Sequence, residues 1–177
     1  MAKCLVVYSS KYGSTAEVAR AVAEGLGAEV ADAAESPDLA PFDVLVFGSP
    51  IYAGDYLESM MTLIRANKDV LAGRKTAAFI TAAADVEIDP GLTGDEDELL
   101  HTQQDYADGL AEMAGGQTLG ARGFSGRLNP DQLDESDRKM LTWFYRFLMR
   151  DELKGFDLLD LPAAKAWGEE LKAKLAE

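Results

Sequence analysis

The sequence predicts an α/β protein in which a five-stranded parallel sheet is covered by helices on both faces. Short apolar stretches with almost no polar alternation recur along the chain, as in strands that are buried on both faces. Segments with apolar residues at helical spacing alternate with these stretches. The chain of 177 residues is also long enough for a sizeable core. We therefore expect residues 1–177 to form a single domain.

Each element is expected from its own local pattern. Strands are expected at residues 4–8, 28–33, 42–48, 75–84 and 117–124. Helices are expected at residues 16–26, 57–66, 95–114 and 161–176. The loops after the first, third and fourth strands are residues 9–15, 49–56 and 82–91. Because the carboxyl ends of parallel strands lie at one edge of a sheet, these three loops are expected to meet there and form a ligand site.

Composition excludes several classes of protein. The net charge of −14 argues against non-specific nucleic-acid binding. The sequence has no long uncharged apolar run, so no membrane-spanning helix is expected. A single cysteine, Cys4, excludes an intramolecular disulfide and a thiolate metal cluster. The N-terminus lacks the layout of a secretory signal, so we expect a cytoplasmic protein.

The turn between the first strand and the first helix has the residues of a phosphate site. Hydroxyl groups can donate to an anion, the first turn of a helix has unpaired N–H groups, and a glycine lets the backbone approach closely. There is no Gly-Lys-Ser/Thr sequence and only one glycine, which excludes a nucleoside-triphosphate loop and a dinucleotide fingerprint. The residues expected to form this site are Ser9, Ser10, Lys11, Tyr12, Gly13, Ser14 and Thr15.

This stretch resembles the phosphate-binding signature of the flavodoxin family. The positions of the signature are occupied by Val6, Val7, Tyr8, Ser10, Gly13, Thr15, Ala19 and Val22. The resemblance implies a flavodoxin-like three-layer sandwich with strand order 2-1-3-4-5. It also implies one FMN, bound without covalent attachment. FMN is expected rather than FAD because the turn offers donors for one terminal phosphate and no second glycine fingerprint is present.

The second and third loops correspond in this resemblance to the loops beside the flavin ring. The second loop contributes Pro50, Ile51, Tyr52, Ala53 and Gly54, and either Tyr52 or Tyr56 is expected to stack on the ring. The alternative is that both are half-buried surface aromatics. The third loop contributes Ala82, Ala83, Ala84 and Asp85 at the edge of the ring. It has no aromatic residue, so we expect the outer face of the flavin to be open to a substrate, which favours an enzyme over a carrier.

The segment of about residues 125–160 is expected to be a helical insert before the last helix. On a helix from Arg138 to Arg150, basic residues share one face and aromatic residues the other. Such a helix either contacts a membrane surface as a peripheral element or packs on the domain. The chain does not predict an oligomeric state.

The whole layout resembles the menaquinone-dependent protoporphyrinogen dehydrogenase group of the flavodoxin superfamily. The resemblance rests on the loop with Ser9, Gly13 and Thr15, on residues 48–56, and on the basic aromatic segment 142–150. It implies oxidation of a porphyrinogen by FMN, with electrons passed to a quinone at the inner face of the membrane. Two alternatives stay open: a soluble flavodoxin electron carrier that docks to basic redox partners, and a non-redox interaction module. We identify no catalytic residue and no metal site.

Overall fold

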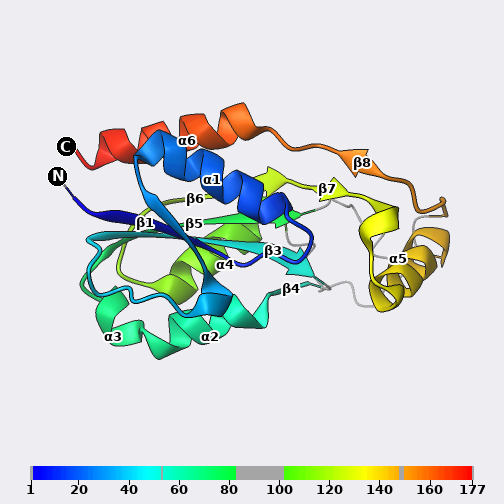
Figure 1. Ribbon diagram of the computed structural model, residues 1–177, viewed down its shortest axis with the longest axis horizontal. Helices are drawn as coiled ribbons and strands as arrows, with labels where there is room; N and C mark the ends of the chain where they lie inside the picture. The colour runs from blue at the N-terminus through cyan, green and yellow to red at the C-terminus, as the bar shows by residue number, and fades with distance from the viewer. Residues whose placement is uncertain (1, 53, 83–101, 148–149, 177) are drawn as a thin grey trace.

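The computed structural model describes residues 2–52, 54–82, 102–147 and 150–176. Five parallel strands form its main sheet (Figure 1). In spatial order they are β2 (Glu29–Asp32), β1 (Cys4–Tyr8), β3 (Val44–Tyr52), β5 (Lys75–Ala82) and β6 (Gln117–Ser125). This order confirms the predicted 2-1-3-4-5 arrangement, because β5 and β6 are the fourth and fifth strands of the sheet along the chain.

Helices cover both faces of the sheet (Figure 1). One face packs against α1 (Ser14–Leu26) and α6 (Leu161–Lys174). The other face packs against α2 (Glu58–Ala66), α3 (Lys68–Leu71) and α4 (Gln103–Ala114). Successive side chains of a strand point to opposite faces. Val6 therefore lies in the core under α1 and α6, while Val7 lies in the core on the other face.

Two glycines let α1 and α6 approach each other closely. A Cβ atom added to Gly25 would lie 2.1 Å from the backbone oxygen of Lys165, and one added to Gly168 would lie 2.2 Å from that of Val22. Both distances are far below van der Waals contact, so each glycine faces the backbone of the other helix. The last helix of the chain is thereby held against the first one.

The third strand is longer than the sequence predicts. Residues 49–52, expected in a loop, continue β3, and its pairing with β5 extends to Pro50 opposite Thr81. The chain then turns back into β4 (Asp55–Tyr56), which pairs antiparallel with the end of β3. Gly54 lies in this turn with a φ of 80°, which suits a residue without a Cβ atom.

The fourth helix begins later than the sequence predicts. Thr102 is its N-cap, and the side chains of Thr102 and Asp105 form a reciprocal capping box with the backbone. Capping of this kind satisfies the free N–H groups of the first turn and therefore marks the start of a helix. The start expected at residue 95, like the loop expected after Ala82, lies outside the described residues.

Residues 126–160 leave the layered body and return to it. The segment contains β7 (Arg127–Leu128), a 3₁₀ turn (Pro130–Gln132), α5 (Glu135–Phe147) and β8 (Phe156–Asp157). β7 and β8 pair antiparallel, so the two ends of the segment lie side by side. α5 lies at the end of the molecule opposite both termini (Figure 1). Helix was expected as far as residue 150, but Arg150 has a left-handed φ of 53°, so helical structure has ended before it.

Candidate functional site

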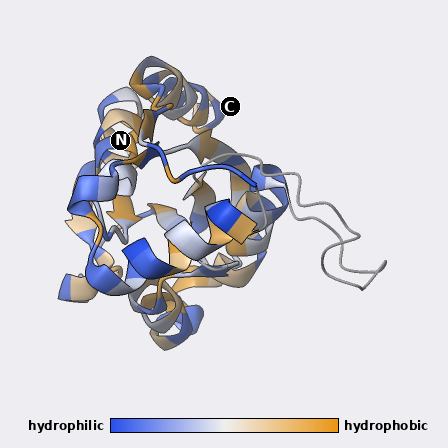
Figure 2. Cartoon of the chain, turned by 90° about the vertical axis from the view of Figure 1, so that its right-hand side faces the viewer, coloured by the Kyte–Doolittle hydropathy of each residue, from blue (hydrophilic) through white to orange (hydrophobic). Residues whose placement is uncertain are grey.

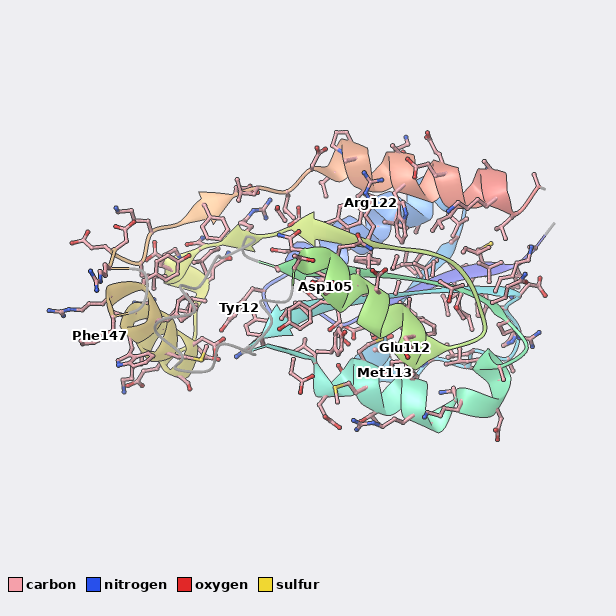
Figure 3. The ribbon with its side chains drawn as sticks, turned by 180° about the vertical axis from the view of Figure 1, so that it is seen from behind. Tyr12, Asp105, Glu112, Met113, Arg122 and Phe147 are labelled. Carbon is pink, nitrogen blue, oxygen red and sulfur yellow. The ribbon has the colours of Figure 1, made fainter. Side chains whose placement is uncertain are left out.

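A pocket opens where the carboxyl ends of β1, β3 and β5 face the 126–160 segment. Three parts of the chain line it: the turn before α1, the ends of β3 and β5, and the segment that includes α5. Figure 3 shows Tyr12 between the end of the sheet and α5. The pocket therefore lies at the edge of the sheet where the sequence predicts a ligand site.

The turn before α1 presents donors without a capping side chain. Gly13 is the N-cap of α1, has a left-handed φ of 97°, and makes no side-chain capping hydrogen bond. Its own N–H donates to Ser10 Oγ at 3.0 Å. A Cβ atom on Gly13 would meet nothing within 4 Å, so the backbone conformation, not space, favours glycine here. The free N–H groups of the first helical turn and the side chains of Ser14 and Thr15 thus form a donor set that suits a phosphate.

Two hydroxyl side chains near the turn already have partners inside the protein. Thr15 Oγ1 lies 2.7 Å from Thr81 Oγ1, and this pair joins α1 to β5 at the wall of the pocket. Ser9 Oγ lies 2.8 Å from Ser59 Oγ of α2 and is buried. Ser9 was expected to be a phosphate donor, but the pocket lining does not include it.

Lys11 and Tyr12 contact α5 and the residues just before it. Lys11 Nζ lies 2.7 Å from Asp137 Oδ2 and 2.9 Å from Asp134 Oδ2. The hydroxyl of Tyr12 donates to Asp137 Oδ2 at 2.6 Å. Hydrogen bonds to Asp137 and Asp134 raise the pKa of Lys11. The pKa of Asp134 is lowered, mainly by the hydrogen bond from the backbone N–H of Asp137 and to a smaller extent by the hydrogen bond from Lys11. The cation of the turn before α1 is therefore paired with two carboxylates.

Of the two tyrosines expected near a flavin, Tyr52 lines the pocket. Its ring centroid lies 6.2 Å from that of Tyr12 at an angle of 50°, and burial raises its pKa. Tyr56 lies elsewhere. Its hydroxyl donates to the backbone oxygen of Tyr106 at 2.8 Å, and its ring meets the edge of the Tyr106 ring.

The structure brings most of the predicted residues together. Those that line the pocket are Ser10, Lys11, Tyr12, Ser14, Thr15, Pro50, Ile51, Tyr52 and Ala82. Three more lie in neighbouring backbone but do not line it, namely Ser9, Gly13 and Gly54. Ala53, Ala83, Ala84 and Asp85 lie outside the described residues.

Sequence reasoning missed one wall of the pocket, which is formed by α5 and the residues before it. Met140, Leu141 and Tyr145 line the pocket from α5. An aromatic residue therefore reaches the pocket from this helix, whereas the expectation of an open outer face considered only the loop after β5. No local pattern could have found these residues, because their position depends on contacts between segments more than 100 residues apart.

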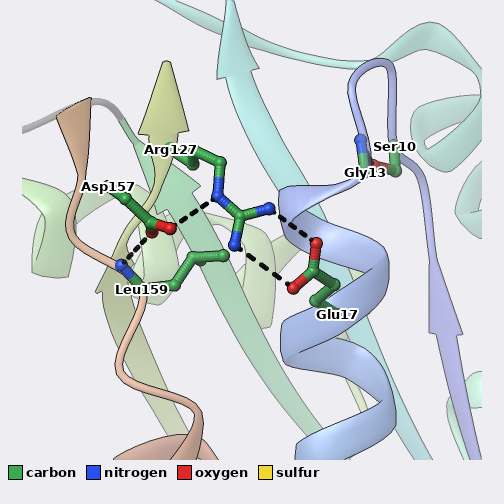
Figure 4. A network of polar contacts seen from close by, with 6 residues as sticks. All are labelled: Ser10, Gly13, Glu17, Arg127, Asp157 and Leu159. Carbon is green, nitrogen blue, oxygen red and sulfur yellow. Dashed lines mark hydrogen bonds and ion pairs between the residues drawn. The ribbon is translucent and has the colours of Figure 1, made fainter. Parts of the chain in front are cut away.

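Arg127 fastens the base of the same segment to α1 (Figure 4). Its guanidinium donates to Glu17 Oε1 at 2.9 Å and to Asp157 Oδ2 at 2.8 Å. These hydrogen bonds, with Asp157 the larger influence, raise the pKa of Arg127. The cations Lys11 and Arg127 of the pocket lining are thus both paired with carboxylates. Among the described residues, no cluster of His, Cys, Asp and Glu could hold a metal ion.

The strand order and the hydroxyl-rich turn before α1 define the class as flavodoxin-like α/β proteins. Residues 5–152 match the family model described as flavodoxin domain. This chain belongs to that family. A comparison with curated proteins gives no match.

Solved structures similar to this chain have the same fold. A WrbA-like flavodoxin from Agrobacterium tumefaciens is 21% identical with a TM-score of 0.57, covering 99% of this chain and 98% of that one. A flavodoxin from the domain Archaea is 18% identical with a TM-score of 0.57 and 99% coverage of both chains. The flavodiiron protein from Giardia intestinalis is 14% identical with a TM-score of 0.59, covering 98% of this chain and 36% of that one.

Proposed function

We propose that this chain is a redox protein that binds one FMN non-covalently in the pocket. The observation that carries the proposal is the uncapped N-terminus of α1, which presents free N–H groups beside Ser10, Ser14 and Thr15. A helix N-terminus of this kind favours a phosphate through both hydrogen bonding and the helix dipole. Membership of the flavodoxin domain family agrees with it.

Different residues of the pocket would bind the phosphate and the ring of the cofactor. Ser10, Ser14 and Thr15 would hold the phosphate, and Tyr52 with Pro50 and Ile51 would lie beside the flavin ring. When bound, FMN supplies one- and two-electron transfer, which protein side chains cannot perform by themselves. The chain's own contribution is to bind and orient the group and to limit the access of water. The remaining predicted contacts, at Ser9, Gly13, Ala53, Gly54 and residues 83–85, stay part of the proposal.

For the reaction, we favour an oxidoreductase of the protoporphyrinogen dehydrogenase type with a quinone acceptor. The apolar side chains of Met140 and Leu141 support this choice, because they give the pocket a wall suited to the apolar part of a large ring substrate. The alternative is an electron carrier that docks to redox partners. The net charge of −14 supports that alternative, because an acidic surface attracts basic partners.

The first experiment concerns the cofactor. The purified protein should be yellow, and chromatography of the cofactor released by heat should give FMN. Recovery of FAD, or a colourless protein that takes up no FMN, would contradict the proposal. The colourless result would instead favour a non-redox interaction module.

The second experiment separates enzyme from carrier. The enzyme should oxidise protoporphyrinogen IX with a menaquinone analogue as acceptor, and a reductive titration should proceed in a single two-electron step. A carrier would show no such turnover and would accept electrons one at a time.

Contact with a membrane is the further part of this proposal. No helix among the described residues is long and apolar enough to cross a bilayer. On α5, however, Met140, Trp143 and Phe147 are 41%, 55% and 59% exposed. Figure 2 views this end of the molecule and shows hydrophobic as well as hydrophilic residues there. We propose that α5 lies on the inner face of the cytoplasmic membrane, where a quinone would be available.

A further inference from the structure

The helix α5 buries a charged residue and exposes its large apolar ones. Asp137 is 9% exposed and is the buried residue of the helix. By contrast, Trp143 and Phe147 are more than half exposed, and Phe147 points away from the sheet in Figure 3. A helix that packs through apolar contacts shows the reverse pattern. The contact that holds α5 to the body of the molecule is therefore largely polar.

Asp137 makes this contact with Lys11 and Tyr12 in the turn before α1. Its Oδ2 atom accepts hydrogen bonds from Lys11 Nζ at 2.7 Å and from the hydroxyl of Tyr12 at 2.6 Å. Asp134 supports the same contact, because its Oδ1 accepts from the Asp137 N–H at 2.8 Å and its Oδ2 lies 2.9 Å from Lys11 Nζ. A buried carboxylate is tolerated when it is paired in this way and is costly when it loses its partner.

Asp137 also shares a face of α5 with the residues that reach the pocket. Leu141 and Tyr145 follow it at intervals of four, which places the three side chains on one side of the helix. Both Leu141 and Tyr145 line the pocket. On the other side of this contact, the ring of Tyr12 lies next to that of Tyr52, with 6.2 Å between the two ring centroids. A single carboxylate therefore connects the wall supplied by α5 with the residues of the cofactor site.

We propose that Asp137 is a positioning residue that fixes α5 as a wall of the cofactor pocket through Lys11 and Tyr12. Lys11 serves this contact and not the phosphate. With two carboxylates around one ammonium group, the cluster has a net charge of −1, and a phosphate placed at Lys11 would meet both carboxylates. The proposal rests on the proposed binding of FMN, but the contact itself can be tested without the cofactor.

The experiment is a double-mutant cycle on Asp137→Asn and Lys11→Met. Each single variant should weaken FMN binding by about tenfold and change the visible spectrum of the bound flavin, because α5 and Tyr12 lose their fixed positions. The double variant should bind FMN no more weakly than the weaker single variant, because both substitutions break one contact. Without FMN, both single variants should be cut faster by protease within residues 126–160. Asp137→Glu should restore part of the affinity.

A matched control lies on the same helix. Lys139 Nζ lies 2.6 Å from Glu135 Oε1 in an exposed pair that does not line the pocket. Lys139→Met and Glu135→Gln should therefore leave affinity, spectrum and cleavage unchanged.

Each contrary result has its own meaning. Additive losses in the double variant would show that Lys11 contacts the phosphate independently and would overturn the positioning role. Faster cleavage with unchanged FMN affinity would show that α5 is not a wall of the cofactor pocket. Unchanged cleavage would show that this contact does not hold α5. Failure of the wild-type protein to bind FMN would defeat the proposed function, while the cleavage test of the contact would still stand.

Discussion

Tyr52 and Tyr56 belong to one hairpin but differ in what surrounds their rings. Tyr52 lines the pocket, whereas Tyr56 packs against α4. We expect Tyr52→Leu to restore much of the flavin fluorescence that the stacked ring quenches in the wild-type holoprotein. Tyr56→Phe is the control and should leave the fluorescence quenched. Equal quenching in the wild type and Tyr52→Leu would show that Tyr52 does not stack on the flavin.

The hydroxyl groups of Ser10 and Thr15 are expected to donate to the phosphate. Combining Ser10→Ala with Thr15→Ala should weaken FMN binding by about 2–4 kcal/mol, because each hydrogen bond to a charged group contributes about 1.5–3 kcal/mol and water compensates in part. Isothermal titration of the apoprotein measures the change. Thr62→Ala is the comparison and should leave the affinity unchanged, because the Thr62 hydroxyl donates to Glu58 within α2 and neither residue lines the pocket. Affinity equal to that of the wild type would place the phosphate elsewhere.

Tyr56 should make the free energy of unfolding depend on pH in the alkaline range. Burial, with smaller effects of Tyr106 and Asp55, raises its pKa from 10.0 to about 12. Between these values the unfolded chain releases the proton and the folded chain keeps it. The stabilisation is therefore complete below pH 10 and is lost as the pH rises toward 12. Urea unfolding at several pH values should show this decline, and Tyr56→Phe should reduce it. A phenolate titration of Tyr56 near pH 10 would contradict the prediction.

For single residues, the sequence predicts those positions that depend on neighbours in the chain. The turn from Ser10 to Thr15 lies beside the pocket because a strand, a hydroxyl-rich turn and a helix follow one another directly. The partners of Lys11 could not be predicted, because Asp137 is 126 residues away in the chain. Tyr52 lines the pocket and Tyr56 does not, because Tyr56 packs against α4, and no spacing in the sequence reveals this packing.

Among the elements, the contact between α1 and α6 is the one most sensitive to a small substitution. Gly25→Ala should destabilise the protein by about 1–3 kcal/mol, because the new methyl group would overlap the backbone of α6. Gly73→Ala is the matched control, since a Cβ atom there meets nothing within 4 Å, and a small gain from the less flexible unfolded chain is expected. Denaturant unfolding of both variants measures the difference. Equal stability of Gly25→Ala and the wild type would show that the helices can separate freely.

Prediction of the elements was accurate where periodicity is strong and inaccurate at their ends. The five strands follow from the apolar pattern, whereas their order was implied by the resemblance to the flavodoxin family. Pro50 and Gly54 favoured a loop after residue 48, yet β3 continues to Tyr52 because β5 and β4 supply its partners. The start of α4 could have been found from Thr102 and Asp105, whose spacing is that of a capping box.

The charge of the whole molecule decides how α5 can meet a membrane. A chain with a net charge of −14 is repelled by anionic lipids, so only a local basic patch can bring it to them. Near such a surface each cation contributes about 1 kcal/mol, and salt weakens this attraction. The cations expected to contribute are Arg138, Lys139, Arg146 and Arg150.

We therefore expect the protein to sediment with anionic vesicles at low salt, but not with neutral vesicles or at high salt. Trp143 fluorescence should shift to the blue on binding, and Trp167 should not contribute because it is buried. Trp143→Ala with Phe147→Ala should reduce binding, while Val30→Ala, an exposed apolar residue on β2, should not. Absence of sedimentation with every vesicle would favour the carrier or an enzyme with a soluble acceptor.

The pairing of β7 with β8 has a consequence for how such a protein can diversify. Gly126 N–H donates to the backbone oxygen of Ala82 at 2.7 Å, and Leu158 N–H donates to that of Gly126 at 3.0 Å. The chain thus departs from the sheet and rejoins it at one point. The entropic cost of closing a loop between two such points grows only slowly with the length of the loop. The outer surface of residues 126–160 can therefore change while β6 and α6 keep their places. The choice of partner can evolve in this way as long as the side chains that line the pocket, and Asp137 with its contact to Lys11, are retained.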